Sequence, residues 1–485
     1  MPGGGAEFRP GRESTEVLGR RTGTPVERSV VKRTAWFTAA TATSLAAAMV
    51  LTGGTASAHD RAGGSRAERD SYGTKAPYLP QGRPGRYQPV PKGYTAVFTE
   101  NVARHGSRAM TDSKDGDAVL ALLAEAQDRG GLTDLGRRLT PQVRSLLAGA
   151  AGIGYGNLSG LGAQEHRQTA LRLEQRLPGL FDTIAATGEP IVVETSGVAR
   201  ATASANAFTA GLTAGRPELA GLIGAPVTDK DLLYFHKQPQ NADYQAYLAK
   251  DQDLAAVLAA VDGMPRTAEA ARHTVGRLFR AGFAATLTAD RQIAFARSLY
   301  ALYSAAPDLA VEAPGVDLDP FLADRDARWF GYLDDAEEFY QKGPAFSGRT
   351  VTYRMAGVLL ADLFAQAEAR AAGTGRNGAV LRFTHAEEIE PLAVLLGLPG
   401  STEPAETDEP YSYRNNPWRG AEVSPMAANI QWDLYAGTTA QGAPGHLVRM
   451  FYNEKETAFP ASCKPVAKGS YFYELGELER CFGRA

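Results

Sequence analysis

The chain has 485 residues, of which 44% are hydrophobic and 22% are charged, so it has ample material for a hydrophobic core. The formal net charge of −3 excludes the broadly basic surface typical of nucleic-acid binding proteins. Two cysteines are too few for a disulfide-dense scaffold or a cysteine-rich metal site.

Residues 1–58 are predicted to be a leader that ends in a secretory signal peptide. Lys32 and Arg33 supply positive charge, residues 35–51 are apolar and rich in small side chains, and Ala56-Ser57-Ala58 matches a cleavage pattern. A membrane anchor is the alternative, but the apolar run is short and is followed by two glycines. We therefore predict a secreted, extracellular protein with no stable membrane association.

Residues 59–92 are rich in glycine, proline, arginine and serine, which is typical of a linker or a draped arm. An α/β core in two parts and a helical insertion, or cap, between them are predicted for residues 93–214, 346–485 and 215–345, respectively. The insertion contains alanine-rich helical patterns and no strong strand pattern. Its histidines, His236 and His273, are predicted to be structural.

The first predicted strand of the core ends at His105, within the segment Arg-His-Gly-Ser-Arg of residues 104–108. A neutral imidazole can attack phosphorus and carry the phosphoryl group covalently. Arg104 and Arg108 can bind the non-bridging oxygens and stabilise their charge during transfer. Gly106 is predicted to remove a side chain that would keep a phosphate from the backbone. A plain surface turn is the alternative for this segment taken alone.

Helical patterns follow at residues 117–150 and in a second stretch that ends at Pro178-Gly179. His166, in the second stretch, has charged neighbours, which favours a solvated or capping role over chemistry. Residues 191–195 form the next predicted strand, and Arg200 follows in the first turn of a helix. Backbone N–H groups and the helix dipole favour an anion there. A surface arginine paired with a carboxylate is the alternative.

A third strand is predicted to end at His385, and Glu387 opens the helix after it. His105, Arg200 and His385 thus each fall at the carboxyl end of a strand or just beyond it. Ligands of open α/β sheets bind at that edge. Three placements of this kind favour a functional site over three unrelated surface residues.

The chemistry divides among these side chains. His105 would attack phosphorus, and Glu387 would protonate the leaving alkoxide and later activate the water that hydrolyses the phosphohistidine. Glu388 is the alternative for that role. The predicted phosphate ligands are Arg104, Arg108, Arg200 and His385.

Residues 385–387 also match the His-x-Glu of zinc deaminases, which require a following Pro-Cys-x-x-Cys. Cys463 and Cys481 are far apart and neither begins such a motif, so we predict no metal and no cofactor. In an oxidising environment the two cysteines could instead pair and close a C-terminal loop, which would stabilise the fold by roughly 3 kcal/mol. Two free buried thiols are the alternative.

Taken together, these motifs resemble the acid-phosphatase branch of the histidine phosphatase superfamily. The branch usually carries His-Asp at the late site. His-Ala-Glu at residues 385–387 is similar instead to the multiple inositol-polyphosphate phosphatases, a phytase-like group. Residues 424–429 and 448–455 add to the resemblance, which covers roughly residues 93–481.

The resemblance implies an α/β fold with an open, mostly parallel sheet flanked by helices and a largely helical second domain, with the substrate between them. It implies His105 as nucleophile, Glu387 as proton donor and a metal-independent reaction. Many members have a proline after the second arginine of the first motif, where this chain has Ala109 and Met110.

We therefore expect a phosphomonoesterase that hydrolyses inositol polyphosphates such as phytate through a phosphohistidine. The alternatives are a broad acid phosphatase for sugar phosphates and other monoesters, and a non-catalytic extracellular binder of phosphorylated ligands. A highly phosphorylated substrate needs further basic residues, and Lys114 is a candidate. Because Glu387 must be protonated to act and glutamate has a pKa of about 4.3, we expect an acidic optimum. The oligomeric state is not predicted.

Overall fold

The computed structural model describes residues 69–438 and 442–484, which belong to one compact unit. The predicted leader and signal peptide of residues 1–58 lie outside the described residues. Within the described part of the chain, no helix combines the length and apolar character needed to cross a membrane.

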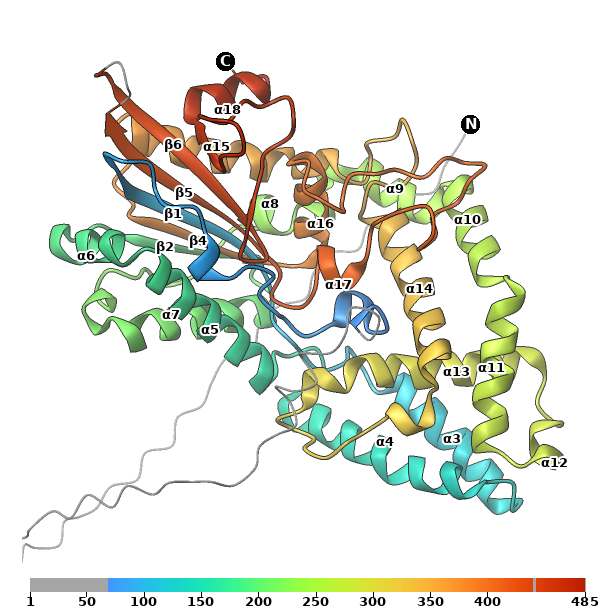
Figure 1. The fold of residues 1–485 in the computed structure, drawn as a ribbon. Coiled ribbons are helices and arrows are strands. Elements are labelled where there is room, and N and C mark those ends of the chain that lie inside the picture. Colours follow the sequence, from blue (N-terminus) through green and yellow to red (C-terminus); the bar gives the residue numbers. More distant parts are fainter. Residues whose placement is uncertain (1–68, 439–441, 485) are drawn as a thin grey trace, which may run out of the picture. The chain divides into compact units, whose positions relative to one another are not determined.

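An open sheet of eight strands forms the centre of the α/β part (Figure 1). The strands are β1 Tyr94–Arg104, β2 Ile191–Thr195, β3 Val227–Thr228, β4 Ala379–Thr384, β5 Asn429–Thr438, β6 Pro444–Tyr452, β7 Lys455–Thr457 and β8 Phe472–Glu474. Their order is β3-β2-β4-β1-β5-β6-β7, with β8 paired to β6. The pairs from β3 to β1 are parallel, and those from β1–β5 onward are antiparallel.

The parallel half of the sheet brings the predicted motifs together. Arg104 at the end of β1 pairs with Thr384 at the end of β4, and Thr195 at the end of β2 pairs with Phe383. The carboxyl ends of β1, β2 and β4 therefore lie at one edge, and the segments that follow them converge there. The prediction that three strand ends share an edge is confirmed.

Helices cover both faces of the sheet (Figure 1). One face carries α5 Gly160–Arg176, α6 Pro178–Thr187 and α7 Ala199–Gly215; the other carries α8 Lys230–Leu233, α15 Gly357–Ala371, α16 Ala386–Leu395 and α18 Leu475–Cys481. Strand side chains alternate between the faces. Leu381 and Phe383 accordingly pack in the core beneath α5–α7, and Val380 packs in the core on the opposite face. The predicted α/β class is confirmed.

The remaining helices form the helical part of the protein. They are α3 Lys114–Asp128, α4 Asp134–Ile153, α9 Ala242–Lys250, α10 Gln252–Asp262, α11 Pro265–Leu278, α12 Ala281–Ala284, α13 Ala289–Ala305, α14 Asp324–Gln341 and α17 Gly420–Val423. Within this helical part, α14 contacts α10, α11, α13 and α17. Short 3₁₀ helices are η1 Gly73–Lys75, η2 Pro84–Arg86, η3 Pro217–Leu219, η4 Phe235–Lys237, η5 Pro239–Asn241, η6 Pro307–Leu309, η7 Asp319–Phe321 and η8 Arg354–Ala356.

The helical pattern at residues 117–150 forms two helices and not one. Gly130 has a φ of +62°, and the Thr133 hydroxyl caps the next helix by accepting from the N–H of Gly136. The two helices pack against each other, and α3 also packs against α13 and α4 against α11, both from the predicted insertion. The boundaries of the insertion at residues 215 and 345 stay a prediction.

The described part of the predicted arm, residues 69–92, is bound to the rest of the protein. Tyr72 stacks on Tyr303, with ring centroids 5.3 Å apart. The backbone N–H of Tyr78 donates to Glu165, and its hydroxyl donates to Glu454. The segment is thus a draped arm held by buried hydrogen bonds.

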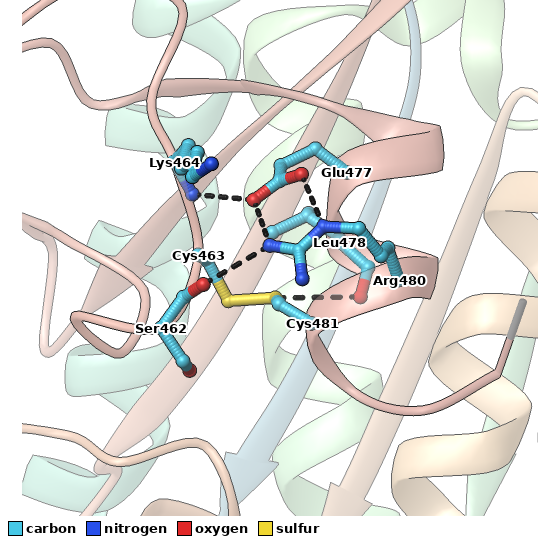
Figure 2. The surroundings of a disulfide bond; sticks show 7 residues. All are labelled: Ser462, Cys463, Lys464, Glu477, Leu478, Arg480 and Cys481. Carbon is cyan, nitrogen blue, oxygen red and sulfur yellow. Dashed lines mark hydrogen bonds and ion pairs between the residues drawn. A yellow bond between two sulfur atoms is a disulfide. The ribbon is translucent and has the colours of Figure 1, made fainter.

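A disulfide bond joins Cys463 to Cys481. Figure 2 shows that two further contacts tie the same two segments together. Arg480 donates to the carbonyl of Ser462, and Glu477 accepts from the N–H of Lys464. The predicted pairing is confirmed, and it fastens α18 to the loop after β7.

Candidate active site

A buried carboxylate holds the segment that follows β1. Glu165, on α5, accepts hydrogen bonds from the N–H and the hydroxyl of Ser107, both at 2.8 Å, and from the N–H of Tyr78 at 2.9 Å. A Cβ atom on Gly106 would lie 2.6 Å from the carbonyl oxygen of Gly162. The absence of a side chain at Gly106 therefore lets α5 approach closely. The sequence-based prediction that it makes room for a phosphate is wrong.

His105 is a buried, neutral imidazole. Its Nδ1 lies 2.9 Å from the carbonyl oxygen of Gly106, so Nδ1–H is the donor and Nε2 carries a free lone pair. Burial, and then the positive charges of Arg104 and its neighbours, hold the pKa of His105 well below its usual range. A deprotonated Nε2 is the form of histidine that can act as a nucleophile.

Three arginines surround this imidazole with unused donors. The Nε atoms of Arg104, Arg108 and Arg200 are buried and have no hydrogen-bond partner among the described residues. Burial, and then the charges of Arg200 and Arg104, lower the pKa of Arg108 to about 10. Buried donors without partners and clustered like charges are both relieved by a bound anion.

Arg104 and Arg200 are each anchored to a different element. The Nη1 of Arg104 donates to the carbonyl oxygens of Thr74 and Ser424, both at 2.5 Å. Arg200 lies in the first turn of α7, where the helix dipole favours an anion. One turn further, the Ser204 hydroxyl accepts from the N–H of Gly106. The arginines are thus fixed around the segment 105–108.

His385 lies beside the nucleophile, with the two ring centroids 5.4 Å apart. Its Nδ1 accepts from Arg200 at 3.1 Å, which leaves Nε2–H to donate to the Ser196 hydroxyl at 2.9 Å. Burial, and then the Arg200 charge, lower the pKa of His385 to about 3. Both ring nitrogens are engaged, so His385 must exchange one of these bonds to act as a phosphate ligand.

Glu387 is the partly exposed carboxylate at this edge of the sheet. Its Oε1 lies 3.4 Å from the Nζ of Lys342, which is itself 2.7 Å from Glu338. Burial raises the pKa of Glu387, but the Lys342 ammonium and the nearby histidines outweigh it and hold this pKa well below its usual range. Glu387 is therefore ionised when the site is empty.

Glu388 is turned away from the site. Its two oxygens are bonded to the Nδ1 of His236 at 2.5 Å and to the hydroxyl of Thr384 at 2.8 Å, and its side chain is fully buried. A carboxylate used in this way is not free to protonate a leaving group. The contact also gives His236 the structural role predicted for it.

Residues 424–429 support the nucleophile from the antiparallel half of the sheet. The N–H of Ala427 donates to the carbonyl of His105 at 2.9 Å. Ala427 holds this position with a φ of +54°, a left-handed conformation that non-glycine residues adopt only at a cost. The Asn429 side chain donates to the Tyr78 hydroxyl at 2.8 Å and links this segment to the arm.

The sequence did not predict the roles that three residues have around the site. His166 is fully buried and donates to the carbonyl of Arg104, so the solvated role predicted for it is wrong. Its spacing from the buried Thr169, Ala170 and Leu173 on α5 is the signal that places it inside. No local sequence pattern indicates the roles of Glu165 and Lys342, because the residues that they contact are distant in sequence.

The candidate phosphate ligand Lys114 does not belong to this set. Its side chain is 86% exposed and pairs with Asp112 at 2.7 Å. Lys342 is the basic residue that lies next to Glu387. Within residues 69–438 and 442–484, no three His, Cys, Asp or Glu side chains are grouped so that they could hold a metal ion.

A family profile described as histidine phosphatase superfamily (branch 2) matches residues 98–237 and 312–453. The matched residues include all six predicted site residues. Among curated proteins, multiple inositol polyphosphate phosphatase 1 of Gallus gallus is 24% identical over 208 residues. That match covers 41% of this chain and 44% of the relative, so less than half of the relative's length is spanned.

Solved structures extend the likeness over most of the chain. The multiple inositol polyphosphate phosphatase of Bifidobacterium longum is 33% identical, and the match covers 85% of this chain and 97% of that one. The TM-score is 0.78 for its complex with phosphate and 0.76 for its complex with inositol hexasulfate. The phytase of D. castellii, 16% identical, shares the fold with a TM-score of 0.62 over 86% of this chain and 84% of that one.

Proposed function

Because the chain belongs to branch 2 of the histidine phosphatase superfamily, we propose that it is a phosphomonoesterase that hydrolyses inositol polyphosphates, phytate among them, through a phosphohistidine intermediate. The observation that carries this proposal is the neutral imidazole of His105 among three arginines whose buried Nε donors have no partner among the described residues. A nucleophile inside an anion cradle is what phosphoryl transfer requires.

In the first step, the Nε2 lone pair of His105 attacks phosphorus as the bond from phosphorus to the ester oxygen breaks. Arg104, Arg108 and Arg200 bind the non-bridging oxygens, whose charge they stabilise. The departing alkoxide takes a proton from Glu387. Although this carboxylate is ionised in the empty site, the negative charge of a bound phosphate raises its pKa and favours the protonated form.

In the second step, Glu387 is the base. Its carboxylate accepts a proton from a water molecule, and the resulting hydroxide attacks the phosphorus of the phosphohistidine. The bond between phosphorus and Nε2 breaks, the electron pair returns to the imidazole, and inorganic phosphate leaves. We propose that both steps proceed without a metal, because the arginines supply the positive charge that the phosphoryl group needs.

The substrate class is proposed from the Bifidobacterium longum relative, which is named for inositol polyphosphates. Lys342 supports it, because this cation lies 3.4 Å from the proposed acid. We propose that Lys342 binds a second phosphate of the same ring. We also propose export from the cell. The disulfide between Cys463 and Cys481 and the predicted signal peptide support this location.

Phosphate release tests the proposal. Inositol hexakisphosphate and a simple aryl phosphate are offered at mildly acidic pH with a chelator present, to the protein and to its His105→Ala variant. Release from the inositol ester that survives chelation and is absent in the variant is expected. Release from the aryl ester alone would assign the protein to general monoesters, and release from neither would leave only a binding function.

A further inference from the structure

A cavity of about 660 Å³ lies on the helical part of the protein, away from the residues of the candidate active site. It is bounded by the start of α11, the first half of α14 and the loop of residues 409–415. Four arginines, a single carboxylate from Glu409 and three aromatic rings line it. The lining is therefore locally positive, although the formal net charge of the whole chain is −3.

The aromatic rings form a fixed floor. Trp329 and Tyr332 have centroids 5.1 Å apart, and Tyr332 and Tyr413 have centroids 5.3 Å apart. The Trp329 indole donates to the Thr267 hydroxyl, the Tyr332 hydroxyl donates to a backbone carbonyl, and the Tyr413 hydroxyl donates to Asp335. Because these polar atoms are hydrogen-bonded within the protein, the side chains offer a ligand their ring surfaces, of which the Arg419 guanidinium covers one face of Tyr413 at 3.8 Å.

The arginines form the rim, and their charges are only partly neutralised. Arg266 and Arg325 share the carboxylate of Asp326, each at 3.5 Å, and Arg266 also lies 3.8 Å from Glu269. Arg328 and Arg414 form no ion pair with any residue in the described ranges. Some exposed arginines elsewhere on the helical part are paired more closely, as Arg291 and Glu125 are at 2.7 Å. The rim therefore carries positive charge without a partner.

We propose that this cavity is a second binding site for an inositol polyphosphate. The apolar C–H face of the ring would lie on the aromatic floor, and its phosphate groups would reach the guanidinium groups of the rim, which suit bidentate binding of phosphate. The identity of the ligand rests on the proposed function, whereas the position and charge of the site do not. Substrate and partly dephosphorylated product share this chemistry.

Calorimetric titration with inositol hexasulfate tests the proposal, because this analogue carries the charges and the ring without a phosphate ester. Two molecules are expected to bind per chain. The double variant Arg328→Ala/Arg414→Ala is expected to bind one, and to retain its activity on an aryl phosphate. The matched control Arg138→Ala/Arg144→Ala removes two exposed arginines of α4 and is expected to bind two.

A single molecule of inositol hexasulfate bound by the wild-type protein, or an equal loss of binding in the two double variants, would overturn the proposal.

A change in tryptophan emission provides a second measurement. Trp418 and Trp432 are buried, so a change on binding at the cavity is expected to vanish in Trp329→Phe. If the protein hydrolyses no phosphate ester but the cavity still binds inositol hexasulfate, the proposed phosphatase activity is wrong and the second site stands. If it hydrolyses phytate but binds only one molecule of inositol hexasulfate, the activity stands and the second site is wrong.

Discussion

The ammonium group of Lys342 lies 3.4 Å from the carboxylate of Glu387. Lys342 comes from the end of α14 and Glu387 from the first turn of α16, so the contact joins the helical part of the protein to the sheet edge. Lys342 holds the pKa of Glu387 down while leaving its carboxylate accessible. The helical part thereby sets the protonation state of the proposed acid.

Replacement of Lys342 by methionine is expected to move the alkaline limb of the kcat profile to higher pH. The proposed acid must be protonated for the first step, so the rate falls as pH rises through its pKa, and removal of the cation raises that pKa. The measurement is kcat against pH with an alkyl phosphate. Lys342→Arg keeps the charge and is expected to keep the profile. An unchanged profile in Lys342→Met would show that this contact does not tune Glu387.

Replacement of Glu165 by glutamine is expected to lower kcat by one to two orders of magnitude. The amide of glutamine cannot accept at both of its ends, so one of the bonds from Ser107 or Tyr78 is lost, and hydrogen bonds to a charged group contribute about 1.5–3 kcal/mol. The measurement is steady-state kcat and KM, with Glu479→Gln on the protein surface as control. A kcat equal to that of the wild type would show that Glu165 is not needed to position His105.

The folded state is expected to lose stability as pH falls below about 6.5. Burial lowers the pKa of His166 to about 3 and, together with Arg200, lowers the pKa of His385 to about 3. The unfolded chain therefore binds more protons than the folded one between about pH 6.5 and 3. Each such histidine costs up to about 1.4 kcal/mol per pH unit across that window.

This acid sensitivity is measured by urea unfolding at several pH values. His166→Gln retains a donor for the Arg104 carbonyl and does not titrate, so its free energy of unfolding is expected to fall less steeply with decreasing pH. Parallel pH profiles for the variant and the wild type would contradict the assignment of His166 as a buried neutral base.

Replacement of both cysteines by serine is expected to lower the free energy of unfolding by about 3 kcal/mol, the entropy contribution of a loop of this size. Activity is expected to persist, because the bond joins α18 to the loop after β7 and touches no site residue. Denaturant unfolding with and without reductant checks both points. Sensitivity to reductant in the double variant would show that another effect is being measured.

The predicted site residues stand at or just after strand patterns that can be recognised in a short stretch of sequence. His105 ends an apolar run, and His385 ends another, so their meeting at one sheet edge follows from parallel pairing. The antiparallel half of the sheet was not predicted, since strand direction depends on partners and not on local pattern. For the same reason, the break between α3 and α4 at Gly130 did not show against a continuous helical periodicity.

Local sequence patterns do not predict the residues that support the site through contacts with distant parts of the chain. Glu165 lies 58 positions from Ser107 and 87 from Tyr78. Lys342 and Glu387 are also brought together only by packing between separate helices. Burial of a carboxylate or an ammonium cannot be read from its neighbours in the chain, so these roles became visible only with the fold.

The covalent role of His105 is tested most directly in the Glu387→Gln variant with 4-nitrophenyl phosphate. This leaving group needs no proton from the protein, so the first step proceeds, whereas hydrolysis of the intermediate lacks its base. Rapid acid-free quenching and mass spectrometry of the peptide that contains His105 are expected to show one phosphoryl group per chain, formed in a burst of nitrophenol. Turnover of the wild-type protein with no phosphoryl group on His105 in the variant would contradict the mechanism.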